Sequence, residues 1–116
     1  MGNFMPVAKA GELADGTMKE VTAQGRNILL ARVGDQYYAV NGRCPHMGGI
    51  LAQGKLEGTV VTCPRHSSQF DLTDGLVVRW LKGSGLISAI GKALKSPRPL
   101  TVYPVKVEKD DILVEV

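Results

Sequence analysis

Metal-binding and disulfide-forming side chains are scarce in this chain of 116 residues, which has two cysteines and two histidines. Two thiols can form at most one disulfide, and they cannot supply the four thiolates of an ordinary iron–sulfur cluster. Aromatic residues make up 5% of the chain, and no apolar run approaches the roughly 18 residues that a membrane span needs. These absences exclude a disulfide-stapled scaffold, a four-cysteine cluster and a transmembrane helix.

Charge of one sign is also lacking, since 14 lysines and arginines stand against 11 aspartates and glutamates, for a net charge of +3. With no basic run and few aromatics, nucleic acid is excluded as the main partner. The length predicts a single domain over residues 1–116, large enough to bury a core of its own. The first residues carry no signal-peptide pattern, so we expect a cytoplasmic protein.

All the cysteines and histidines fall in two short segments, Cys44-Pro45-His46 and Cys63-Pro64-Arg65-His66. Thiolate and neutral imidazole are the preferred donors for soft and borderline metals. Each segment pairs one thiolate with one imidazole, which suits a [2Fe–2S] centre with two cysteines on one iron and two histidines on the other. Zinc also accepts Cys2His2, although usually with each ligand type paired in one segment. A Cys44–Cys63 disulfide and an incidental cluster are further alternatives.

These two segments resemble the cluster-binding loops of the Rieske family, and the similarity continues through Ser67-Ser68-Gln69-Phe70-Asp71-Leu72. The resemblance implies a Rieske-type [2Fe–2S] cluster as the cofactor. It also implies that Cys44 and Cys63 hold the buried iron, and that His46 and His66 hold the iron nearer to solvent.

The resemblance also predicts the redox class. High-potential members of the family carry an extra cysteine in each loop, where this chain has Gly49 and Arg65. They also place a serine and a tyrosine hydroxyl beside the cluster. Ser68 matches the serine, but Phe70 stands at the tyrosine position and has no hydroxyl to donate. We therefore expect a low-potential, ferredoxin-like protein.

Short runs of valine, isoleucine and tyrosine are broken by Gly, Asn and Asp about every ten residues, which is typical of a small antiparallel β domain. We expect an all-β fold, and the resemblance implies a Rieske-like antiparallel β sandwich or barrel whose cluster-binding subdomain has loops at about 42–50 and 63–70. The pattern predicts strands over residues 4–8, 17–23, 26–33, 36–40, 56–62, 70–72, 76–79, 101–108 and 112–116.

One segment departs from the β pattern, because apolar residues recur at helical spacing between positions 83 and 95. Leu86, Ile87, Ile90 and Leu94 predict a short helical insert with one apolar face. This face would pack on the sheet or, alternatively, form a docking surface. The Pro97-Arg98-Pro99 segment that follows resembles the third loop that covers the cluster in the Rieske family.

The chain offers no second site for substrate chemistry, since both histidines are already assigned and no Gly-rich nucleotide loop is present. We therefore expect no enzyme activity, but a one-electron carrier that takes electrons from a reductase and passes them to a terminal oxygenase or another redox enzyme. We expect a monomer or a weak oligomer that docks around His46, His66 and Arg65. A permanently bound Rieske subunit of a larger oxidoreductase complex and a zinc-stabilised interaction domain are the alternatives.

Overall fold

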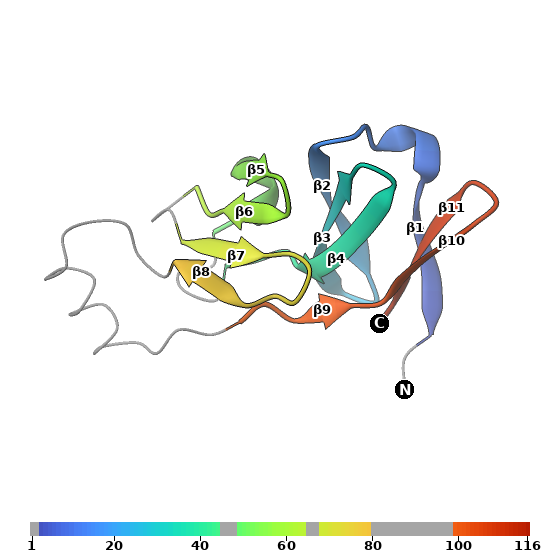
Figure 1. Ribbon diagram of the computed structural model, residues 1–116. Coiled ribbons are helices and arrows are strands. Elements are labelled where there is room, and N and C mark those ends of the chain that lie inside the picture. The colour runs from blue at the N-terminus through green and yellow to red at the C-terminus, as the bar shows by residue number, and fades with distance from the viewer. Residues whose placement is uncertain (1–2, 45–48, 65–67, 80–98) are drawn as a thin grey trace, which may run out of the picture.

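The computed structural model describes residues 3–44, 49–64, 68–79 and 99–116. Within these residues the regular structure is antiparallel β-sheet, as the sequence predicts, together with two short 3-10 helices that were not predicted (Figure 1). The elements are β1 (Phe4–Lys9), η1 (Ala10–Glu12), β2 (Thr17–Ala23), β3 (Arg26–Val33), β4 (Gln36–Asn41), η2 (Leu51–Gln53), β5 (Lys55–Glu57), β6 (Val60–Thr62), β7 (Gln69–Asp71), β8 (Val77–Arg79), β9 (Val102–Tyr103), β10 (Val105–Glu108) and β11 (Asp111–Glu115). The predicted helical insert near 83–95 lies outside the described residues. No helix in the described part is long and apolar enough to cross a membrane.

The strands form three sheets. Their orders are β1-β11-β10, β2-β3-β4-β9 and β5-β6-β7-β8. Figure 1 shows the β2-β3-β4-β9 sheet between the other two, with the β5–β8 sheet on one side and the β1-β11-β10 sheet on the other. We call the β5–β8 sheet the cluster-binding sheet, because the two loops with the predicted ligands join it to the middle sheet or to itself.

The middle sheet packs on both faces because β3 is apolar on both. Leu29 and Ala31 belong to a core shared with the cluster-binding sheet, whereas Ile28 and Leu30 belong to a second core with β11. All four are fully buried, as expected for a strand that lies between two other layers. We call the first of these cores, which also contains both cysteines, the cluster core.

Tight turns hold β3 in register at both ends. Ala23 pairs with Arg26 across Gln24 and Gly25, whose φ angles are 51° and 76°. Val33 pairs with Gln36 across Gly34 and Asp35, with φ 63° at Gly34. Both are two-residue hairpin loops with positive φ where such loops require it.

The single strand predicted over residues 56–62 is wrong. The chain instead makes a hairpin of β5 and β6, with Glu57 paired to Val60 across Gly58-Thr59. Gly58 has φ 59°, a left-handed conformation that a residue with a β-carbon disfavours. A glycine at the first position of a two-residue turn is the signal of this hairpin, and the neighbouring β-branched residues conceal it.

The single strand predicted over residues 101–108 is wrong as well. Pro104 separates β9 from β10, and the two strands enter different sheets. Val102 and Tyr103 pair with β4 in the middle sheet, while β10 forms the predicted hairpin with β11. Proline cannot donate a ladder hydrogen bond, so it sits where the chain changes sheets. The other predicted strands are confirmed within one or two residues at their ends.

Candidate metal centre

The two loops that carry the predicted ligands are closed in the same way. The Cys44 amide donates a hydrogen bond of 2.9 Å to the Gly49 carbonyl, and the Cys63 amide donates one of 2.8 Å to the Ser68 carbonyl. Each loop therefore begins with a cysteine whose N–H bonds the carbonyl five positions later. A β-bridge between Arg43 and Ile50 continues the closure of the first loop.

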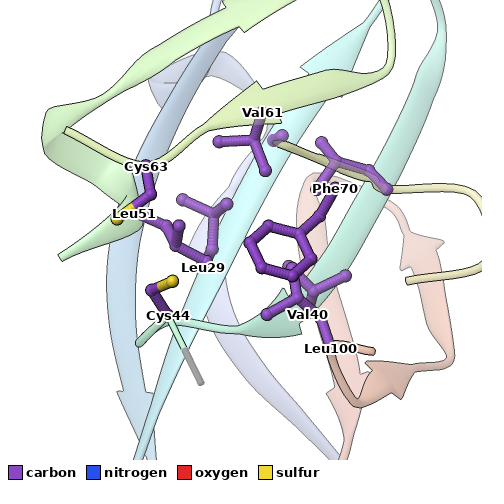
Figure 2. Close-up of a cluster of buried hydrophobic side chains, with 10 residues drawn as sticks. Leu29, Val40, Cys44, Leu51, Val61, Cys63, Phe70 and Leu100 are labelled. Carbon is purple, nitrogen blue, oxygen red and sulfur yellow. The ribbon is translucent and has the colours of Figure 1, made fainter. Parts of the chain in front are cut away.

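The two cysteines lie together in the cluster core. Cys44 is 2% exposed and Cys63 1% exposed, and both belong to the same buried group as Leu29, Leu51 and Phe70. Figure 2 shows the cysteines at one end of this group, with the Phe70 ring beyond Leu29. The cysteines are not joined by a disulfide. The two thiols therefore share one water-excluding environment, although they come from loops far apart in sequence.

A glycine brings η2 close to the second loop. A β-carbon at Gly54 would collide with the Thr62 carbonyl oxygen and lie 3.2 Å from Cδ of Pro64. Thr62 and Pro64 flank Cys63, so the turn after the first loop packs directly on the chain that delivers the second cysteine. Gly54 was not among the predicted site residues. The sequence marks no hairpin turn at Gly54. Close approach of another backbone is therefore the reason for a glycine at this position.

A second glycine joins the chain after position 98 to the cluster core. The Leu100 amide donates to the Gly75 carbonyl at 2.7 Å, and the Asn41 amide donates to the Thr101 carbonyl at 2.9 Å. Leu100 is 3% exposed and belongs to the cluster core. The third loop predicted over residues 97–99 is described at Pro99 alone, which is exposed.

Asp71 ends the strand that leaves the second loop, and its carboxylate caps the following turn. It accepts hydrogen bonds from the Thr73 amide at 3.0 Å and the Thr73 hydroxyl at 2.7 Å. These bonds, first from the amide and then from the hydroxyl, lower the pKa of Asp71 from its usual value. The carboxylate thereby stabilises the turn that leads to Gly75.

Of the predicted site residues, the structure brings Cys44 and Cys63 together. His46 and His66 lie outside the described residues, as does Arg65. Ser68 and Phe70, the two residues expected to influence the potential, are both fully buried, and Phe70 is part of the cluster core.

Comparison with known proteins settles the family. The family model described as "Rieske [2Fe-2S] domain" matches residues 3–88. The chain belongs to the Rieske [2Fe–2S] family. It is 31% identical over 109 residues to the ferredoxin component of biphenyl 2,3-dioxygenase of Rhodococcus jostii (strain RHA1), an alignment that covers 94% of this chain and 89% of the relative.

Solved structures agree with this assignment. The ferredoxin of carbazole 1,9a-dioxygenase from Nocardioides aromaticivorans IC177 is 24% identical with a TM-score of 0.80, covering 97% of this chain and 96% of that one, and shows the same fold. A chain from a complex of reduced oxygenase and oxidised ferredoxin in carbazole 1,9a-dioxygenase is 28% identical with a TM-score of 0.77, covering 97% and 92%.

The cofactor of this Rieske protein is therefore a Rieske-type [2Fe–2S] cluster. The described part of the chain fits it, because two buried thiols share one apolar core and begin two loops of matching closure. The protein is an electron carrier of the ferredoxin kind rather than an enzyme.

Proposed function

We propose that Cys44, His46, Cys63 and His66 hold the [2Fe–2S] cluster, with the cysteines on one iron and the histidines on the other. The observation that carries this is the burial of both cysteines in one core, at the start of two loops closed by the same hydrogen bond. The histidines follow their cysteines by two and three positions in the sequence. When bound, the cluster supplies reversible one-electron chemistry.

The protein residues around this site determine solvent access and polarity. Leu29, Leu51 and Phe70 surround the cysteines with apolar side chains, so water is kept from the thiolate side of the site. Phe70 has no hydroxyl to donate to the cluster or to a thiolate, which is why we assign the protein to the low-potential class. This absence of a donor leaves the reduced, more negative state less stabilised.

We further propose that the carrier works in the cytoplasm, taking electrons from a reductase and passing them to the terminal oxygenase of a ring-hydroxylating system. Relatives are ferredoxin components of dioxygenase systems, and one solved structure of a relative is a complex of reduced oxygenase and oxidised ferredoxin. The matches cover 89% and 86% of the two named relatives and 92% of the chain in that complex.

Ligand replacement tests the cluster assignment. Cys44→Ser and Cys63→Ser should each lose the two irons, the two acid-labile sulfides and the visible spectrum. Ala31→Ser is the matched control, because it places the same hydroxyl in the same fully buried core and should keep the cluster. Cysteine variants that retain iron and spectrum, or wild type that binds zinc alone after anaerobic reconstitution, would reject the assignment.

Ionic strength tests the docking face proposed around the two histidines. Arg65→Glu should slow electron transfer to the oxygenase at low salt, and the loss should shrink as salt screens the interaction. Lys109→Glu is the control, since it reverses a charge on the exposed β10–β11 turn, which Figure 1 shows away from the cluster-binding sheet. A Lys92→Glu variant tests the predicted insert. Equal rates for wild type and Arg65→Glu at every salt concentration would move the docking face elsewhere.

A further inference from the structure

A glutamate on the middle sheet faces the cluster core. Glu20 of β2 lies directly opposite Leu29 of β3, and Leu29 belongs to the cluster core with Cys44. Met18, two residues before Glu20, packs against the same core. Because side chains alternate along a strand, Glu20 points to the face of the sheet that the cluster-binding sheet covers.

The Glu20 carboxylate pairs with the residue directly before the first cysteine. Its Oε2 lies 3.3 Å from Nη2 of Arg43, with the two side chains 26% and 36% exposed. Its Oε1 is buried and has no hydrogen-bond partner in the described part of the chain. A β-carbon at Gly42 would lie 3.1 Å from that oxygen. The carboxylate is therefore pressed against the backbone that leads into Cys44.

The Arg43 backbone is held independently of this ion pair. Its carbonyl accepts a hydrogen bond of 3.2 Å from the Asn41 side-chain amide, and its strand bridge to Ile50 fixes its place at the base of the first loop. The ion pair therefore orients the guanidinium rather than the loop. A half-buried pair at this distance is screened by water and salt less than a surface pair.

We infer that Glu20 is a positioning residue that lowers the reduction potential by neutralising Arg43 beside the cluster. Reduction adds one negative charge to the centre, which an uncompensated arginine would favour. Pairing with Glu20 removes that stabilisation and holds the guanidinium against the carboxylate. This inference rests on the proposed ligand set, because it requires the cluster to lie next to Cys44.

Charge-removing variants test the inference by voltammetry at low salt and one fixed pH, because salt screens the charges that the variants remove. Glu20→Gln keeps the shape and should raise the equilibrium constant for reduction about threefold to tenfold, the order of magnitude of one unit-charge interaction across partly solvated protein. A tenfold change corresponds to 59 mV for one electron. Arg43→Met should lower the constant by a similar factor. The double variant should return close to wild type.

The chain contains a matched control pair on the other face of the same strand. Lys19, next to Glu20, bonds Glu12 at 3.0 Å, and the two side chains are 38% and 46% exposed. Glu12→Gln and Lys19→Met remove the same charges away from the cluster core, and both should keep the wild-type potential. A shift as large in these controls as in Glu20→Gln would overturn the inference.

Two further readouts separate a failed inference from a failed ligand assignment. Iron and sulfide content and the EPR spectrum of wild type test the ligands, whereas the inference fails if fully loaded Glu20→Gln keeps the wild-type potential. A purely structural role predicts that result together with a lower melting temperature. If Glu20→Gln does not retain its cluster, Arg43→Met decides, because an unchanged potential in that variant also overturns the inference.

Discussion

Replacing Gly75 with alanine should weaken the attachment of Leu100 to the cluster core. Gly75 has φ 76°, and a β-carbon there would collide with the Leu100 carbonyl oxygen and lie 2.9 Å from Cγ2 of Val102. Both atoms belong to the segment that leads into β9 of the middle sheet, and the Leu100 oxygen is a backbone atom. The substitution therefore requires the segment at Leu100 to move away from the turn.

The expected loss in the free energy of unfolding has two parts. A residue with a β-carbon in the left-handed region costs about 1–2 kcal/mol. Displacing Leu100 weakens the hydrogen bond of 2.7 Å that its amide donates to the Gly75 carbonyl, which contributes about 1 kcal/mol. Together these predict a loss of about 2–3 kcal/mol in the free energy of unfolding. In a domain of this size the melting temperature should fall by roughly 10 °C.

Gly58→Ala is the control for the conformational part alone. Gly58 has φ 59°, but nothing lies within 4 Å of the β-carbon that alanine would add. Its melting temperature should fall about half as far. Scanning calorimetry of cluster-loaded protein measures both melting temperatures. The heating rate is kept the same for both variants, because the melting temperature depends on it when unfolding is irreversible. Equal decreases for the two variants would refute the collision at Leu100.

Three further predictions concern the potential and acid stability. Phe70→Tyr should raise the reduction potential and Ser68→Ala should lower it, and voltammetry showing both at the wild-type value would indicate that these buried residues only pack. The potential should be constant around neutral pH and fall at alkaline pH as the imidazoles of His46 and His66 lose protons, so a steep slope already at neutral pH would contradict the low-potential class. Because the pKa of Asp71 is lowered in the folded protein, its carboxylate stabilises the fold at any pH above the pKa of an unfolded aspartate. This stabilisation is lost as the pH falls through the lowered pKa of the folded state. The melting temperature of Asp71→Asn should therefore depend less on acid pH than that of wild type, and equal slopes would exclude this carboxylate as a source of acid sensitivity.

The strands that sequence reasoning located well are those whose limits are local. The β2–β3 and β3–β4 turns contain glycines at positive φ, and the three strands that they join are six to eight residues long. Each of these features depends on a few neighbouring residues. Strands β2, β3 and β4 could therefore be predicted almost residue by residue.

The errors came where the partner of a strand decides its limits. Residues around Gly58 and Pro104 have β-forming neighbours on both sides, and the sequence pattern alone continues through them. At Gly58 the turn signal is local but is concealed by these neighbours. At Pro104 the change of sheet depends on a hydrogen-bond partner far away in sequence, which is β4 for β9. Local propensity does not contain that information.

The site was predictable for a different reason. Cysteine and histidine are rare in this chain, so their clustering at positions 44–46 and 63–66 is informative without any knowledge of the fold. What the sequence could not provide is the surroundings of Cys44 and Cys63. The close packing at Gly54, the attachment of Leu100 at Gly75 and the carboxylate of Glu20 beside Arg43 all arise from tertiary contacts.

The two-sided burial of β3 leaves its apolar pattern unable to choose a register. Ile28 to Ala31 are apolar at four successive positions, so a slip by one residue would still place apolar side chains in both cores. The native register is therefore selected over the shifted one by the two-residue turns at Gln24-Gly25 and Gly34-Asp35. Inserting one residue into either turn would thus create a competing, equally apolar arrangement in which Ile28 and Leu30 face the cysteines. These turns, rather than the core, make this chain adopt one fold instead of two.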